Sequence, residues 1–230
     1  MASQLAEIET ALDAAGLNLR GALSAARYDA IVPAVWRTAA LLPAARTALV
    51  VGSGGRALWD ALRTAPEFEA VSDPVDTYTA RVLDALARDL IRAGHRSRAL
   101  YPLERRGGKW ADFVALGREA GLGVFSRLGL LLHPIYGPWL SIRAVLLTGL
   151  ECPLGAPIRD FDPCEGCAAP CVEACPGGAV GPERISASIC YATQRTEPAC
   201  ALRCAARHAC VLGPEQAYSV EAEAHHMGSD

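Results

Sequence analysis

The distribution of cysteine constrains this 230-residue chain more than any other feature. Eight of the nine cysteines lie in one stretch of fewer than fifty residues: Cys164, Cys167, Cys171, Cys175, Cys190, Cys200, Cys204 and Cys210. The first four follow the spacing Cys-x2-Cys-x3-Cys-x3-Cys-Pro, and the gaps between the last four are wider. A compact run ending in Cys-Pro is typical of two-cluster iron-sulfur proteins, in which three thiolates bind one 4Fe-4S cluster and the fourth binds the other. The pattern therefore predicts two 4Fe-4S clusters and a role in electron transfer.

The two clusters divide the cysteines by analogy with two-cluster ferredoxins. We expect Cys164, Cys167, Cys171 and Cys210, the first cysteine set, to bind one cluster. Cys175, Cys190, Cys200 and Cys204, the second cysteine set, are expected to bind the other. Cys152 has no partner in the pattern, and we expect it to be a small buried apolar residue.

Two other kinds of cysteine site compete with the clusters. Four thiolates also suit tetrahedral zinc, although zinc ribbons usually pair short Cys-x2-Cys knuckles across a longer gap. A disulfide framework is typical of secreted chains, and the N-terminal residues indicate a polar helix rather than an apolar secretory segment. Both alternatives remain open, and both are less favoured than iron-sulfur clusters.

Length and composition suggest a large domain followed by a small one. We expect a cysteine-free domain at 1–150, an iron-sulfur domain at 151–220 and a tail at 221–230. The net charge of -3 and the pI near 6.0 disfavour a nucleic-acid partner, which requires a basic surface. The longest apolar stretch, 128–150, contains two prolines, a histidine and an arginine, so it is not expected to span a membrane. These features predict a cytoplasmic protein.

Helical and strand patterns alternate along the first 150 residues. Apolar periodicity predicts a helix at 3–15, and a short apolar run bounded by glycine predicts a buried strand at 46–52. A long helix is expected to begin at Pro74, with Asp73 as its N-cap. The other expected elements are helices at 56–63 and 110–120 and strands at 97–101, 128–132 and 140–147. This mixture predicts an α+β or α/β fold.

The segment from Leu132 to Leu147 has the form His-Pro-x-aromatic-Gly-x-Trp-x-x-Ile-Arg-x-Val. It resembles the corresponding segment of the CblC-type cobalamin-processing chaperones. It is also similar to that of epoxyqueuosine reductase and the reductive dehalogenases, in which a corrinoid domain precedes a two-cluster ferredoxin domain. The resemblance implies an α+β fold, with a nitroreductase-like corrinoid-binding domain followed by a small two-cluster ferredoxin-like domain.

The resemblance also implies roles for five residues of this segment. His133 is expected to contact the corrinoid or its displaced base, and Gly137 to allow close approach of a large flat ligand. Trp139 either covers a macrocycle face or fills core volume. Arg143 needs a partner, and a propionamide, a phosphate or a carboxylate such as Glu151 would each serve. Tyr136 is a candidate proton donor.

Two functions from different classes follow from these observations. The favoured one is a corrinoid-dependent reductase that takes electrons from reduced ferredoxin or flavodoxin and removes the upper ligand of bound cobalamin, or uses cobalamin for another reduction. The alternative is a ferredoxin-like electron carrier whose N-terminal domain docks a partner or binds flavin. A zinc-stabilised interaction module is a third hypothesis.

Overall fold

The computed structural model describes residues 2–228 and divides the chain into two compact units. The first unit contains the residues up to Leu122 together with Ser141–Pro157. The second contains Gly123–Leu140 and the residues from Ile158 onward. The division differs from the expected boundary near residue 150, because the segment Gly123–Leu140 packs with the cysteine-rich segment. Both units mix helices with strands or bridges, and the chain as a whole is a mixed α/β protein.

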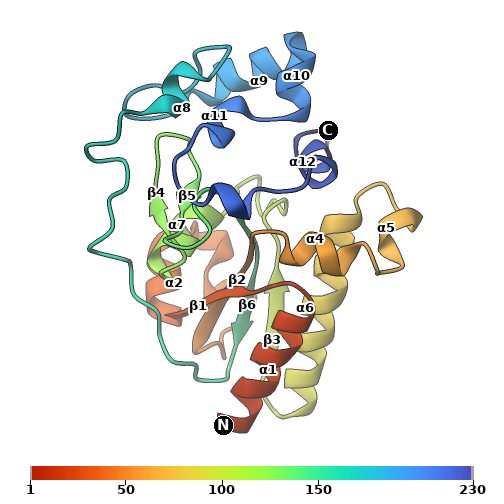
Figure 1. Ribbon diagram of the computed structural model, residues 1–230. Coiled ribbons are helices and arrows are strands. Elements are labelled where there is room, and N and C mark those ends of the chain that lie inside the picture. Colours follow the sequence, from red (N-terminus) through yellow and green to blue (C-terminus); the bar gives the residue numbers. More distant parts are fainter. Residues whose placement is uncertain (1, 229–230) are drawn as a thin grey trace. The chain divides into compact units, whose positions relative to one another are not determined.

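The first unit is built on a four-stranded sheet with the order β1-β2-β6-β3 (Figure 1). Its strands are β1 (Leu19–Ser24), β2 (Thr47–Gly54), β3 (Ser97–Leu100) and β6 (Leu140–Thr148). The outer strands are antiparallel to their neighbours, with Leu19 opposite Gly52 and Ser97 opposite Thr148. The helices of the unit are α1 (Ala2–Ala14), α2 (Ala25–Ile31), α3 (Thr38–Leu41), α4 (Ala57–Leu62), α5 (Glu67–Ala70), α6 (Pro74–Arg92) and α7 (Phe113–Glu119), with a 3-10 turn at Ala34–Trp36.

The main hydrophobic core lies on one face of this sheet. Val50 of β2 and Val145 of β6 are fully buried there, as side chains alternate between the two faces of a strand. Trp36 is the largest side chain of this core, and its indole N–H donates to the carbonyl of Lys109 at 2.9 Å. The hydroxyl of Tyr28 donates to the carbonyl of Trp36 at 2.8 Å. These bonds satisfy the polar atoms of two large core side chains.

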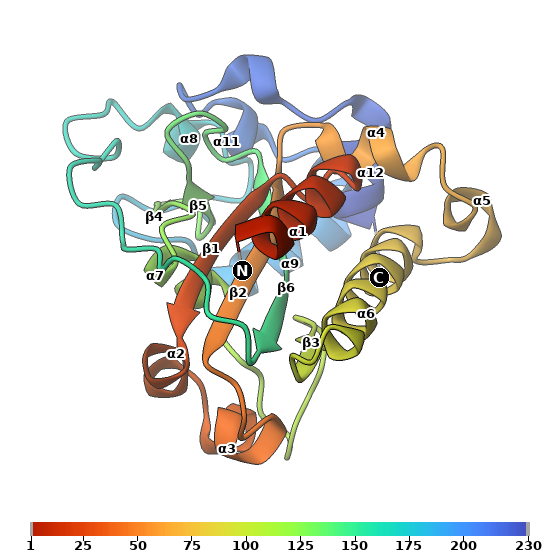
Figure 2. The same ribbon diagram turned by 90° about the horizontal axis from the view of Figure 1, so that it is seen from below.

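The long helix α6 begins where the sequence predicts. The side chain of Asp73 accepts a hydrogen bond from the backbone N–H of Asp76, and Pro74 occupies the first turn. The helix packs against β3, and its Tyr78 donates a hydroxyl hydrogen bond to the carbonyl of Ala15, just beyond α1. Helices α1 and α6 accordingly lie beside each other (Figures 1 and 2).

The second unit consists of a two-stranded ladder and several short helices. Strand β4 (Val124–Phe125) pairs antiparallel with β5 (Leu131–Leu132). The strands expected at 128–132 and 140–147 correspond to β5 and β6, and they belong to two different sheets. The helices are α8 (Pro170–Glu173), α9 (Ala187–Thr196), α10 (Pro198–Leu202), α11 (Ala205–His208) and α12 (Val220–Gly228), with a 3-10 turn at Pro214–Gln216. The expected tail at 221–230 is therefore helical up to Gly228, and residues 229–230 lie outside the described part of the chain.

A small core joins the ladder to the cysteine-rich helices of the second unit. Leu128, Cys171, Val180 and Ala206 are buried in it, and Cys175, Cys204 and Cys210 pack against it. This packing places the segment before β6 with the cysteines. None of the helices within residues 2–228 has the length and apolar character needed to cross a membrane.

Candidate iron-sulfur and cofactor site

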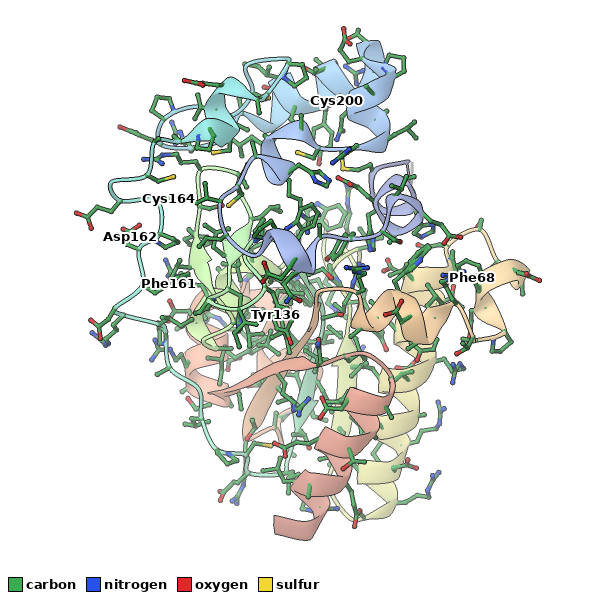
Figure 3. All side chains as sticks on the ribbon, viewed as in Figure 1. Phe68, Tyr136, Phe161, Asp162, Cys164 and Cys200 are labelled. Carbon is green, nitrogen blue, oxygen red and sulfur yellow. The ribbon has the colours of Figure 1, made fainter. Side chains whose placement is uncertain are left out.

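The eight clustered cysteines line two separate pockets of the second unit. The first cysteine set lines a pocket of about 360 Å³, which Leu128, Leu132 and Leu212 also line. The second cysteine set lines a pocket of about 480 Å³ beside α9 and α10. Cys164 and Cys200, one from each set, lie well apart (Figure 3). The structure thus brings together the same two groups of four that the sequence predicts.

Thiols of one set influence one another electrostatically. Burial raises the pKa of the Cys171 thiol, and the charges of Cys210, Cys164 and Cys167, all of the same set, raise it further. In the second set, burial raises the pKa of Cys190, and Cys204 and Cys175 add to this rise. Four thiolates cannot ionise together in such a pocket without a compensating charge. A bound metal centre supplies that charge, because it deprotonates its thiol ligands.

The loop of the first set is ordered by local backbone hydrogen bonds. A carboxylate oxygen of Asp162 accepts from the backbone N–H groups of Cys164 at 3.3 Å and Glu165 at 3.2 Å. The N–H of Ala169 donates to the sulfur of Cys167 at 3.4 Å. Ala169, with φ of 57°, is the only non-glycine residue within 2–228 that has a positive φ. Hydrogen bonds within the protein chain thus help to position the thiols of this loop.

Short helices carry the second set. Cys190 is on α9, Cys200 is on α10, and Cys204 immediately precedes α11. Helix α9 approaches the Cys175 loop so closely that a Cβ at Gly177 would lie 1.9 Å from the hydroxyl oxygen of Thr193. Glycine is therefore required there for α9 to close the pocket.

A buried carboxylate supports the same pocket from α12. Glu223 is only 3% exposed and accepts from the backbone N–H of Cys204 at 3.1 Å. Its other oxygen lies 2.6 Å from Nε2 of His208. Sequence analysis did not identify Glu223 or His208, because nothing in a lone acidic residue or histidine marks it as a neighbour of a cysteine far along the chain.

The spacing of the cysteines bears on the type of metal centre. Across residues 2–228, no group of three or more His, Cys, Asp or Glu side chains is close enough to bind one metal ion. Tetrahedral zinc requires four ligands around a single ion. Each cysteine of a cubane binds a different iron, so its four sulfurs lie farther apart. All nine cysteines have free thiols, so the disulfide alternative has no counterpart in the described residues.

The loop from His133 to Trp139 is a tight turn at the end of β5. His133 and Gly137 exchange backbone hydrogen bonds of 2.9 and 2.8 Å. Nδ1 of His133 accepts from the backbone N–H groups of Ile135 at 3.1 Å and Tyr136 at 3.4 Å. Burial lowers the pKa of the half-buried His133 ring. His133 thus orders its own loop, and a contact with a corrinoid remains a prediction.

Gly137 has a packing role within the second unit. Its φ is 54°, and an added Cβ would lie 2.3 Å from the carbonyl oxygen of Leu212. In this structure, the backbone of Gly137 therefore lies close to the segment of the chain after Cys210. A close approach to a flat ligand remains a prediction.

Trp139 fills core volume, which is one of its two expected roles. It is 2% exposed, and the rings of His208 and Tyr218 lie 4.8 and 5.4 Å from it, centroid to centroid. Its buried indole N–H has no hydrogen-bond partner in the described part of the chain. An unpaired buried donor is uncommon and is a position where a bound group can supply the acceptor.

Arg143 lies in the first unit, on β6. Its guanidinium is 3.5 Å from the carboxylate of Asp76 at the start of α6. Glu151, expected as a possible partner, instead pairs with Arg46 at 2.5 Å. The partner is thus a carboxylate, as in one of the expected alternatives, but α6 and not the nearby turn supplies it.

Cys152 lies in the first unit and belongs to neither cysteine set. It is half-buried, and its backbone N–H donates to the hydroxyl of Thr47 at 3.3 Å. Burial, followed by the charge of Glu9, raises the pKa of its thiol. Such a thiol is weakly reactive.

Comparison with known proteins gives a likeness of fold. No family model and no curated protein matches the sequence. An epoxyqueuosine reductase solved with an epoxyqueuosine-modified tRNA-Tyr stem loop matches with a TM-score of 0.63 at 18% identity, over all of this chain and 70% of the other. A reductive dehalogenase, whose structure suggests a mechanism for B12-dependent dehalogenation, matches with a TM-score of 0.58 at 18% identity, over 85% of this chain and 29% of the other.

These likenesses establish the fold and not the activity, given their low identity. The chain spans 59% to 70% of the length of the epoxyqueuosine reductases that it resembles and about a third of that of the dehalogenases. The B12-trafficking protein CblC of C. elegans, 18% identical, matches over 70% of this chain and 78% of its own with a TM-score of 0.49, which is too low to establish a shared fold.

Proposed function

We propose that the protein is a corrinoid-dependent reductase with two 4Fe-4S clusters. The arrangement of the eight cysteines carries this proposal, because two sets of four thiols line two pockets of one unit. The fold likeness to an epoxyqueuosine reductase and to a reductive dehalogenase described with B12-dependent chemistry supports the corrinoid part. On this proposal, the segment up to about residue 150 contributes the corrinoid domain, and the cysteine-rich segment is ferredoxin-like.

The residues present fit two cubanes. Each pocket offers four thiols, as a cubane requires, and mainly apolar walls. When bound, the clusters supply one-electron transfer, and a corrinoid supplies the cobalt chemistry. Residues of α9, α10, α11 and α12 line the second pocket, and Asp162 and Glu223 hold the backbone of the cysteines in place.

The loop from His133 to Trp139 is the proposed contact with the corrinoid. Its rigid hydrogen-bonded turn, with Nδ1 of His133 already occupied, leaves Nε2 of this ring for a ligand. The unpaired indole N–H of Trp139 is a donor that a ligand acceptor or a water can satisfy. Tyr136 is half-buried in the same turn, and we assign it the role of proton donor. Arg143 is also proposed as a cofactor contact, and its guanidinium is held by Asp76 rather than by Glu151.

Anaerobic purification followed by metal analysis and cobalamin titration tests the proposal. We expect a brown protein with roughly eight irons per chain. We also expect hydroxocobalamin to bind with a changed visible spectrum, and reduced ferredoxin or flavodoxin to reduce the bound form. Zinc in place of iron, or two clusters without cobalamin binding, would contradict it.

The second candidate function is a ferredoxin-like carrier with a partner-docking or flavin-binding first unit. The absence of cobalamin binding in a redox-active protein would favour it. We also propose a cytoplasmic location and no nucleic-acid partner, since the net charge is -3. One protein of similar fold was solved with a tRNA stem loop. A binding titration with tRNA in place of cobalamin therefore tests whether this protein binds nucleic acid.

A further inference from the structure

One cation, Arg207 on α11, is held rigidly beside the second cysteine set. Its guanidinium contacts two adjacent aromatic rings, 4.5 Å from the centroid of Trp139 and 4.6 Å from that of Tyr218. It also donates to the carbonyl oxygen of Pro138, through Nε at 3.2 Å and Nη2 at 2.7 Å. The charge of this side chain is therefore fixed in direction and partly shielded from water.

The same residue lines the pocket of the second set and acts on one of its thiols. Burial raises the pKa of Cys204, but a hydrogen bond from the backbone of Arg207 and the positive charge of Arg207 both oppose this rise. Cys175 and Glu223 act in the opposite direction. The carboxylate of Glu223 is shared with His208 and lies 3.9 Å from the guanidinium of Arg203. Arg207 thus places a positive side chain at the wall of the pocket of the second set.

We propose that Arg207 raises the reduction potential of the cluster bound by the second cysteine set. The inference rests on the proposed two-cluster function. Reduction transfers one electron from an external donor to the cluster and so adds one negative charge. A fixed positive charge nearby stabilises the reduced form, and net charge and hydrogen bonds to sulfur are the established controls of cluster potential.

Arg207 also links this cluster to the loop of the proposed corrinoid contact. Its backbone N–H donates a hydrogen bond to the thiol of Cys204. Its guanidinium donates to the carbonyl of Pro138 and packs on the ring of Trp139. The second set is therefore separated from the loop by a single side chain. A higher potential at this set favours the arrival of electrons at its cluster.

A redox titration of the anaerobic holoprotein, followed by electron paramagnetic resonance with dithionite as donor, tests the proposal. The variants are Arg207→Gln, which removes the charge, and Arg207→Lys, which moves it to a shorter and more hydrated group. The matched control is Arg195→Gln, which removes one charge from the exposed face of α9 in the same unit. Iron content is measured for each protein before the titration.

In Arg207→Gln we expect one of the two midpoints to become more negative by on the order of 59 mV, a tenfold change for a one-electron couple. The other midpoint, and both midpoints of Arg195→Gln, should stay unchanged. Equal shifts of both midpoints, or none, would overturn the proposal. If Arg207→Gln does not retain both clusters, Arg207→Lys decides, because its midpoint must also fall below that of the wild type. A wild-type protein without two clusters would instead refute the proposed function itself.

Discussion

His133 illustrates how one predicted site residue is used by the structure. Its Nδ1 accepts two backbone hydrogen bonds and must therefore be unprotonated, and burial lowers its pKa below the ordinary value near 6.5. The unfolded chain takes up a proton near pH 6.5, whereas the folded chain does so only at lower pH. The stability contributed by His133 is thus complete above about pH 6.5 and is lost as pH falls through the folded pKa.

The variant His133→Asn tests this assignment. An asparagine side chain can accept the same backbone hydrogen bonds but does not titrate. Between pH 7.5 and pH 5.5, we expect the urea midpoint to fall more for the wild type than for His133→Asn. Parallel pH profiles would contradict the assignment, and other titrating groups cancel because both proteins contain them.

The residues that were predictable from sequence are those whose chemistry is written in their spacing. The grouping of the eight cysteines into two sets was expected by analogy with two-cluster ferredoxins, and the structure groups them in the same way. The partner of Arg143 did not follow, because Asp76 is brought to it only by the packing of α6 beside the sheet. Arg207 was missed for the same reason, since an arginine between two cysteines has no distinguishing local pattern.

At the scale of elements, the turn from His133 to Trp139 is joined to the chain after Cys210. Gly137→Ala should place a methyl group 2.3 Å from the carbonyl oxygen of Leu212 and also strain a residue with φ of 54°. The expected loss of unfolding free energy is about 2–5 kcal/mol, combining about 1–2 for the backbone and about 1–3 for overpacking.

Gly178→Ala is the matched control for this change. Gly178 has φ of 63° in the same unit, but a Cβ added there would have no atom within 4 Å of it. It should lose only the backbone contribution of about 1–2 kcal/mol. Urea denaturation followed by circular dichroism measures both, and equal losses would show that the contact with Leu212 is unimportant.

Elements with a strong local pattern were predicted and elements defined by packing were not. Helix α6 has a cap, a proline in its first turn and a long apolar periodicity, and its start was predicted correctly. Strand β1 was missed because Arg20 and Gly21 interrupt its apolar pattern. Gly21 lies against the carbonyl of Ala120, a contact that the sequence does not reveal.

At the scale of the whole molecule, chain order did not predict the division into units. The apolar segment 128–150 looked like one continuous part of the first domain. Its first portion instead joins the cysteines, because Leu128 is buried against Cys171 and Val180. Each unit is thus assembled from two separated parts of the sequence.

The two cysteine sets predict a specific pattern of iron loss. The two sets line separate pockets, so removing a ligand from one set should leave the other cluster intact. Cys171→Ala and Cys175→Ala should each retain about half of roughly eight irons. Cys152→Ala, in the first unit, should retain all of them and is the control.

Double variants make the division between the sets decisive. Cys164→Ala with Cys171→Ala removes two ligands of one cluster, so about four irons should remain. Cys171→Ala with Cys175→Ala removes one ligand from each cluster, so nearly all iron should be lost. Iron analysis and the visible spectrum of the anaerobic proteins distinguish the two. Equal iron in the two double variants, or more iron in Cys171→Ala with Cys175→Ala, would mean that the ligands are divided differently.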